Sequence, residues 1–316
     1  MYYKHQREEM SLKKVRLRST LFIAVLLLAV NLHAIVGATK GSADVNQGSF
    51  TYDLEITTPK GISGLAPNLS INYNSSNKTN STFGIGFNLT GLSMISKCKE
   101  TLFSEKNDTS RTYNYCIDGQ KLLLEDTSGN TSNVYGNANT SYKTQINNQS
   151  KITKLSDGWE VRTKDGLIYQ YGQTTDSNDG DVFYKVNKIS DRYNNDINFI
   201  YENTNDEQHI KQITYANNII DFNYENRTDV KDIYSFGVKA SLHKRVNNIS
   251  IKTGTTEISS YKFVYEYVDY KSRITSLQEC VGTECLEPLV FSWEDSESSF
   301  GEFENWGSNA TNVDQY

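Results

Sequence analysis

Proline, methionine and histidine are scarce in this sequence, and tyrosine is abundant. Of 316 residues, three are proline, three are methionine and four are histidine, whereas 21 are tyrosine. Tyrosine and threonine favour pleated, half-buried surfaces over helices. A hydrophobic content of 37% over this length is sufficient for a substantial core. The composition therefore predicts an all-β protein.

Long apolar runs are also scarce. The most prominent, Leu21–Val30, has ten residues, about half of the roughly 20 that a membrane-spanning helix needs. Basic residues precede it, and Val36-Gly37-Ala38 supplies the small residues of a cleavage site. We predict a secretory signal peptide over residues 1–38, cleaved after Ala38, and a secreted mature chain without a stable membrane span. An uncleaved membrane anchor is the alternative.

Clusters of positive charge are lacking beyond this leader. Residues 39–316 contain 26 Lys and Arg against 36 Asp and Glu, spread evenly along the chain. A protein that follows a nucleic-acid backbone or an anionic membrane needs a basic stripe or patch. We therefore expect no nucleic-acid partner and no electrostatic attachment to a membrane surface.

The residue patterns of catalytic and metal sites are lacking too. The two histidines beyond the leader, His209 and His243, have no Ser, Cys or Asp arranged around them as in a catalytic triad, and we expect both on the surface. The acidic stretch at residues 176–181 lacks the Gly and Glu positions of a calcium loop and is typical of a polar hairpin loop. We predict no enzymatic activity and no catalytic, cofactor-binding or metal-binding residues.

Four cysteines in an exported chain favour disulfides. Local pairing, Cys98 with Cys116 and Cys280 with Cys285, is the simplest of the three possible connectivities. A four-thiolate zinc site is the alternative, but neither cysteine pair has the CxxC-like spacing that such sites use.

Tandem hairpins are evident in the second half of the sequence. The segments Ile189–Glu202 and Ile213–Glu225 align with a single deletion, and each combines a strand, an Asn-rich turn and a strand that ends in Phe-x-Tyr-Glu. A looser third copy runs from 246 to 267, and 273–277 with 288–293 forms a fourth pair. The aromatic residues at alternate positions are typical of a core face, and the Asn-Asn pairs tolerate left-handed turns.

A set of motifs in fixed order carries a family resemblance. The first group is Pro59-Lys-Gly61, then Gly64-Leu-Ala-Pro67-Asn-Leu-Ser-Ile-Asn-Tyr73, then Gly84-Ile-Gly86-Phe87. "CIDGQKLLL" with Asp118-Gly119, "WEVRTKDGLIYQYG" and "EPLVFSWED" follow. Together they resemble the N-terminal domain of the Salmonella virulence plasmid B (SpvB) proteins and of the B components of insecticidal toxin complexes. Phe87 departs from the usual Trp.

This resemblance implies structural roles for the motif residues. The Gly-x-Gly stretch lacks the rest of a phosphate-binding loop, and its glycines are expected to permit bulges or close backbone approach. We expect an SpvB-like β domain over residues 39–296, with Tyr-Asp-type hairpins from about residue 186, and a linker over 297–316 toward a downstream propeller or Rhs region. The fold implied is an antiparallel meander of tandem hairpins in a large curved sheet, part of a shell-like scaffold.

The resemblance also implies a function. B components build a shell with a C-type Rhs-like component, enclose a toxic passenger and connect to an A-type pore component. SpvB proteins instead carry an ADP-ribosyltransferase in a separate C-terminal domain. Such enzymes need a Ser-Thr-Ser strand, which this chain lacks, and Glu302-Phe-Glu304 is the one candidate Glu-x-Glu pair. We expect a non-catalytic scaffold. A delivery module of a single-chain toxin, and a β-rich adhesin or glycan-binding protein, are the alternatives.

Overall fold

The fold is built almost entirely from antiparallel strands. The computed structural model describes residues 37–99, 113–125, 134–180, 182–204, 207–236 and 238–294. Within these ranges the helical structure is one short 3-10 turn, η1 (Ile62–Gly64), so the all-β prediction is confirmed. The leader up to residue 36, the linker at 297–316 and the Glu302–Glu304 pair lie outside the described residues.

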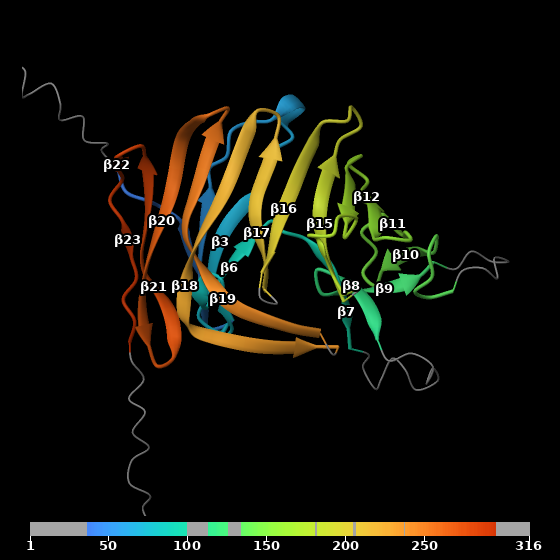
Figure 1. Ribbon diagram of the computed structural model, residues 1–316, viewed down its shortest axis with the longest axis horizontal. Helices are drawn as coiled ribbons and strands as arrows, with labels where there is room; N and C mark the ends of the chain where they lie inside the picture. The colour runs from blue at the N-terminus through green and yellow to red at the C-terminus, as the bar shows by residue number, and fades with distance from the viewer. Residues whose placement is uncertain are drawn as a thin grey trace, which may run out of the picture.

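A small sheet forms the first layer. Its strand order is β1-β2-β3-β6, with bounds β1 (Ser42–Asn46), β2 (Ser49–Ile56), β3 (Leu69–Asn74) and β6 (Phe87–Thr90). A two-stranded hairpin, β4 (Asn80–Ser81) and β5 (Gly84–Ile85), lies between β3 and β6 in the chain. In Figure 1 this layer, in blue and teal, lies behind a much larger sheet.

The second unit is a closed barrel. Antiparallel pairings run from β7 through β8, β9, β10, β11, β12, β13 and β15 back to β7. The strands are β7 (Met94–Cys98), β8 (Asn114–Ile117), β9 (Gln120–Leu124), β10 (Ser141–Thr144), β11 (Lys151–Lys154), β12 (Trp159–Arg162), β13 (Ile168–Tyr171), β14 (Asn178–Asp179) and β15 (Phe183–Ser190).

Aromatic side chains fill this barrel. Trp159 is fully buried, and its ring centroid lies 4.8 Å from that of Tyr115, 5.2 Å from Tyr142 and 6.2 Å from Tyr184. A small barrel has an interior that side chains can fill completely. The interior is therefore a packed core rather than a channel.

From β15 the sheet continues as a curved row of hairpins (Figure 1). The strands are β16 (Asp196–Thr204), β17 (Glu207–Tyr215), β18 (Asn218–Ser235), β19 (Val238–Thr253), β20 (Thr256–Val268), β21 (Lys271–Val281), β22 (Glu284–Cys285) and β23 (Leu289–Val290). The hairpins predicted from the sequence repeats are confirmed, including the fourth pair, in which Leu277 lies opposite Leu289.

One turn differs from its prediction. In the hairpin between β15 and β16 the left-handed residue is Asn194, at φ 62°, as the Asn-Asn pair suggests. In the hairpin between β17 and β18, however, it is Ala216, at φ 47°, because Asn218 already pairs with Tyr215 as the first residue of β18.

Each Phe-x-Tyr motif, and the similar Tyr169-Gln-Tyr171 stretch of β13, coincides with a β-bulge. The pairing register shifts just before Tyr171, Tyr201, Tyr224 and Tyr265, so that one extra residue lies on the strand that follows. The residues opposite these four tyrosines are Val186, Ile210, Val246 and Ile274. Bulges bend a strand and increase its twist, and their repetition accounts for the curvature of the sheet.

At each bulge, an aromatic side chain of the next hairpin along the sheet donates a hydrogen bond to a backbone carbonyl. Tyr201 donates its hydroxyl proton to the carbonyl of Val186 at 2.8 Å, Tyr224 to that of Ile210 at 2.5 Å and Tyr265 to that of Val246 at 2.6 Å. Trp293 donates its indole N–H to the carbonyl of Ile274 at 2.8 Å. We call these four bonds the aromatic ladder. "FSW" is therefore a further copy of the repeat, with Trp in place of Tyr.

Strands β18 and β19 extend beyond the sheet as a two-stranded arm that reaches toward β7 and β8 (Figure 1). At its tip the ring of Phe236 lies 6.3 Å from that of Tyr113. No helix of the described ranges is long and apolar enough to cross a membrane.

Candidate functional site

The glycines of the family motif permit close approach, Gly84 to the large sheet and Gly86 to a ring of the first layer. A Cβ atom on Gly84 would lie 2.6 Å from the carbonyl oxygen of Ser272 in β21, and one on Gly86 would lie 2.6 Å from the ring of Tyr73. Both glycines have left-handed backbones, at φ 83° and 79°, which other residues adopt only at a cost. Their structure supports the expected role in close backbone approach.

Phe87 lies where the first and last motifs of the family meet. It is buried, and its ring centroid is 4.8 Å from that of Tyr73, 5.1 Å from that of Phe291 and 6.4 Å from that of Trp293. The neighbouring indole of Trp293 already occupies part of this space, which gives a physical reason for the smaller Phe at this position.

The turn between β2 and β3 holds the remaining motif residues of the first group. Gly64 has a left-handed backbone, and a Cβ on Gly61 would lie 1.8 Å from the carbonyl oxygen of Leu65. Tyr215 of the large sheet donates a hydrogen bond to the carbonyl of Pro59 at 2.9 Å, and Pro67 is buried. These residues join the two layers.

Asp118 and Gly119 form the tight turn between β8 and β9, with φ values of 46° and 81°. The Asp118 carboxylate accepts hydrogen bonds from the hydroxyl of Ser93 at 2.6 Å and from the backbone N–H of Met94 at 2.9 Å. Its hydrogen bonds therefore serve the start of β7.

The structure contains both disulfides that the spacing favours. Cys98 in β7 bonds Cys116 in β8, with Cα atoms 5.9 Å apart, and Cys280 in β21 bonds Cys285 in β22 directly across the hairpin. The predicted cleavage point after Ala38 lies close to the second disulfide in space, because Thr39 donates its N–H to the carbonyl of Glu287, two residues after Cys285, at 2.9 Å.

A buried ion pair connects the β4–β5 hairpin to the large sheet. Arg227 and Asp229 lie in a register shift of β18, and their side chains are 0% and 2% exposed. The guanidinium donates to both carboxylate oxygens, at 2.8 and 2.9 Å, and to the carbonyl of Ser81 at 2.8 Å. Asn80 and Ser272 donate to the carboxylate at 2.6 and 2.7 Å.

These contacts set the protonation state of Asp229. Burial acts to raise the pKa of its carboxyl, but the hydrogen bonds from Arg227, Ser272 and Asn80 outweigh burial and hold the pKa well below its usual range. The pair is ionised and has its hydrogen bonds satisfied, as a structural clamp requires.

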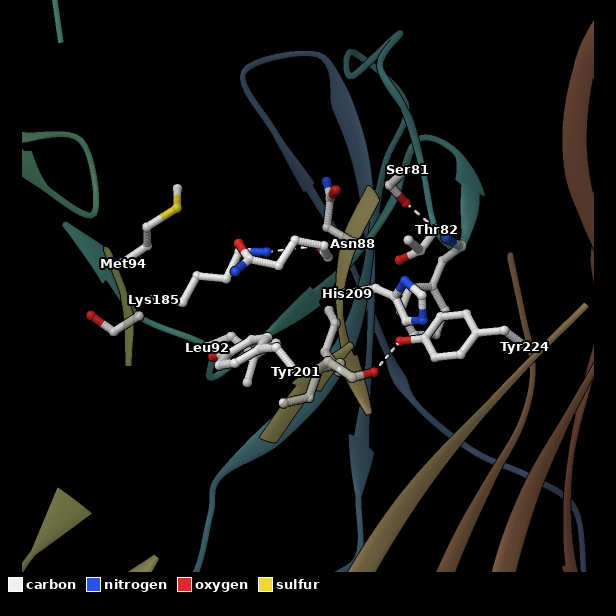
Figure 2. Close-up of a pocket in the computed structure, with 14 residues that line it drawn as sticks. Ser81, Thr82, Asn88, Leu92, Met94, Lys185, Tyr201, His209 and Tyr224 are labelled. Atoms are coloured by element: carbon white, nitrogen blue, oxygen red, sulfur yellow. Dashed lines mark hydrogen bonds between the residues drawn. The ribbon is translucent and has the colours of Figure 1, made fainter. Parts of the chain in front are cut away.

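A cavity of about 280 Å³ lies between the segment 81–94 and the strands β15 to β18. Figure 2 shows the labelled lining residues: Lys185, Tyr201, His209 and Tyr224 come from the large sheet, and Ser81, Thr82, Asn88, Leu92 and Met94 come from the segment 81–94. This cavity is the candidate functional site, because it brings titratable side chains together in a partly open pocket.

Lys185 supplies the positive charge of the cavity. Its ammonium donates to the carbonyl of Gln208 at 2.7 Å and lies 5.2 Å from the ring centroid of Tyr201. Burial lowers the pKa of this amine to about 8, against the smaller opposing effects of Asp179 and Glu207. At neutral pH most of the molecules carry the charge.

His209 is buried, so its predicted surface position is wrong. Its side chain is 5% exposed, and its ring centroid lies 4.2 Å from that of Tyr224. Burial lowers its pKa to about 4, and the ring is therefore neutral at pH 7.

Glu207 is the acidic neighbour of this ring, with Oε1 at 4.0 Å from Nδ1 of His209. Its carboxylate accepts the backbone N–H of His243 at 2.7 Å. Burial raises the pKa of Glu207.

The alternation of Glu207 and His209 on β17 was the available signal for this site. Residues two apart on a strand share a face, and the burial pattern places both inward. The sequence does not show that Lys185 lines the same cavity as His209. In chemical terms the arrangement offers a cation, a neutral imidazole and amide groups, which are suited to binding.

Acid should destabilise the fold through His209. Its pKa is about 4 in the folded chain and about 6.5 unfolded, so below pH 6.5 the unfolded state binds a proton that the folded state does not. The free energy of unfolding should fall by on the order of 3 kcal/mol from pH 6.5 to pH 4 through this group. Urea unfolding at pH 7 and pH 4 measures the loss, which should shrink by that amount in His209→Gln.

The matched control is His243→Gln, which removes the other histidine of the described ranges, a half-buried one. This variant should retain the full acid loss of the native chain. An acid loss in His209→Gln equal to that of the native chain would contradict the prediction.

Comparison with known proteins gives the class first. The fold matches the crystal structure of TcdB2-TccC3, with a TM-score of 0.65 and 14% identity, over 83% of this chain and 17% of that one. A Tc holotoxin pore of Photorhabdus luminescens matches over 83% of this chain and 16% of that chain, with a TM-score of 0.65 and 13% identity. The chain thus spans about a sixth of the length of these relatives. It has the fold of a β-rich domain found in Tc toxins.

The family match is more specific. The SpvB family, described as Salmonella virulence plasmid 65kDa B protein, matches residues 44–304, and the chain belongs to this family. The N-terminal domain of effector protein SpvB from Salmonella typhimurium strain LT2 has a similar fold, with a TM-score of 0.58 and 14% identity, over 72% of this chain and 98% of that one. No curated protein sequence matches the chain.

Proposed function

We propose that this chain is a secreted, non-catalytic scaffold domain of a B-type toxin-complex protein. It helps to build a shell with a C-type Rhs-like component, and the shell encloses a toxic passenger and connects to an A-type pore component. The observation that carries the proposal is the aromatic ladder. Each hairpin of the large sheet bends at the same bulge and bonds to its neighbour in the same way, which suits a sheet that grows by adding hairpins.

Three further observations support a scaffold. The family motif residues Gly84, Gly86 and Phe87 serve the junction between the layers. The Asp118-Gly119 turn connects strands β8 and β9. Among the described residues no Ser or Cys hydrogen-bonds the ring of His209, so this histidine is not part of a Ser-His or Cys-His pair.

The test is co-elution of the purified full chain with a C-type Rhs-like component encoded nearby, in size-exclusion chromatography. We expect a stable complex and no labelling of host-lysate proteins from labelled nicotinamide adenine dinucleotide. Labelling by the chain alone would contradict a non-catalytic role.

A second candidate function rests on a specific comparison. The N-terminal domain of effector protein SpvB has a similar fold over 72% of this chain, and this likeness supports a delivery module of a single-chain toxin. Failure to associate with any Rhs-like chain, together with absence of labelling, would favour this second function over the shell.

A further inference from the structure

The cavity at Lys185 has the chemistry of a ligand site rather than of a packing defect. The Oε1 atom of Gln208 and the Nδ1 atom of His209 are buried and have no hydrogen-bond partner among the described residues. Both residues line the cavity. Buried polar atoms in folded proteins are nearly always partnered, and an unpartnered one costs about 1–3 kcal/mol. A ligand with a hydrogen-bond donor can satisfy them.

The charge of the lining residues selects the sign of that ligand. Lys185 is the one charged side chain among them at neutral pH, since His209 is neutral and the lining contains no Asp or Glu. Glu207 is not part of the lining, and its Oε1 lies 4.0 Å from Nδ1 of His209. A single ammonium with a single protein hydrogen bond, to the carbonyl of Gln208, retains donors for an anionic group.

Four uncharged polar residues, Ser81, Thr82, Asn88 and Ser93, also line the cavity, and the rest of the wall is apolar or aromatic. Between the polar groups the lining consists of Phe83, Leu89, Leu92, Met94, Ile210 and the two tyrosine rings, Tyr201 and Tyr224. The hydroxyl of Tyr224 is already bonded to the carbonyl of Ile210, so this ring presents mainly its apolar surface. At about 280 Å³ the space is at the small end of ligand pockets, which are roughly 300–1,000 Å³.

We propose that this cavity binds a small, hydroxyl-bearing apolar carboxylic acid, with its carboxylate on the ammonium of Lys185, its apolar body between the aromatic and aliphatic walls, and its hydroxyl at Gln208 and His209. The site is a binding site, and it is independent of whether the chain builds a toxin shell.

The experiment titrates the full chain with 4-hydroxybenzoate at pH 7 and measures binding by calorimetry and by ligand-observed NMR. The control ligands are 4-hydroxybenzamide, which lacks the charge, and benzoate, which lacks the hydroxyl. We expect the hydroxy acid to bind with a dissociation constant below about 1 mM and about tenfold more tightly than either control. Absence of binding by the acid, or equal binding of acid and amide, would overturn the proposal.

Two variants assign the contact. Lys185→Met keeps the aliphatic stem and removes the ammonium, so it should weaken binding of the acid about tenfold and leave that of the amide unchanged. Lys188→Met is the matched control on the same strand, because Lys188 pairs with Asp196 at 2.7 Å and does not line the cavity. Equal losses in the two variants would contradict the assigned contact. If Lys185→Met does not fold, the comparison of acid with amide on the native chain still decides.

Discussion

Replacing Asp229 by alanine should lower the free energy of unfolding by about 3–5 kcal/mol. The substitution leaves the guanidinium of Arg227 buried without its counter-charge, in a place where its side chain is 0% exposed. It also removes the acceptor that serves Asn80 and Ser272. Breaking a buried pair on one side is costly because the remaining charge keeps its full desolvation penalty. Urea unfolding at pH 7 measures the change.

The matched control is Asp232→Ala on the same strand. Asp232 pairs with Lys239 at 3.3 Å, but its side chain is 45% exposed. Exposed pairs contribute about 0–1 kcal/mol, and this variant should stay within that range. A double variant, Arg227→Met with Asp229→Ala, should lose less than the sum of its single variants because it leaves no unpaired charge. A small loss in Asp229→Ala, comparable to the control, would show that water compensates the guanidinium.

The sequence predicted the large sheet well because the strands that pair in this sheet are neighbours along the chain. Each hairpin consists of two neighbouring strands joined by a short turn, and the repeated Phe-x-Tyr-Glu ending identified the strands that pair. The bulges were not predicted. Phe199 and Tyr201 fit a regular alternation, whereas the extra residue, Lys211, lies on the opposite strand and has no turn-forming character.

The barrel was not predicted, for a different reason. Its strands are short and unlike one another, and closure depends on the pairing of β7 with β15, in which Ile95 lies opposite Tyr184. Nothing in the sequence near either residue identifies the other. The cavity was not predicted for the same reason, because it depends on contacts between distant parts of the chain. Lys185 and His209 come from two strands of the large sheet, while Ser81 and Met94 come from the first half of the chain.

For the family-motif residues, the sequence indicated a structural role but not the contacts that explain it. The sequence resemblance assigned Gly84 and Gly86 a role in close approach but could not name their neighbours, which are Ser272 and Tyr73. Residue 272 is almost 190 positions away in the chain from Gly84. A glycine in a sequence shows that space is limited, and only the fold shows which group limits it.

Removing the ladder hydroxyls together should have an effect as large as breaking the buried ion pair. Tyr201→Phe, Tyr224→Phe and Tyr265→Phe each keep the ring but leave a bulge carbonyl, of Val186, Ile210 or Val246, without its side-chain donor. Tyr201 is buried and Tyr224 and Tyr265 are half-buried, and burial raises the pKa of each hydroxyl. A carbonyl that loses its donor in such a place costs about 1–2 kcal/mol.

The triple variant should therefore lose about 3–6 kcal/mol of unfolding free energy. The three hydroxyls lie on different strands and bond different carbonyls, so their losses should add. The control variants are Tyr193→Phe and Tyr270→Phe, whose side chains belong to residues 72% and 86% exposed, and each should stay within about 0.5 kcal/mol of the native chain. Urea unfolding of single, triple and control variants provides the comparison. A triple variant within 1 kcal/mol of the native chain, on the order of a single hydrogen bond, would mean that the bulges hold their curvature without the ladder, and that the repeated tyrosines serve the core through their rings alone.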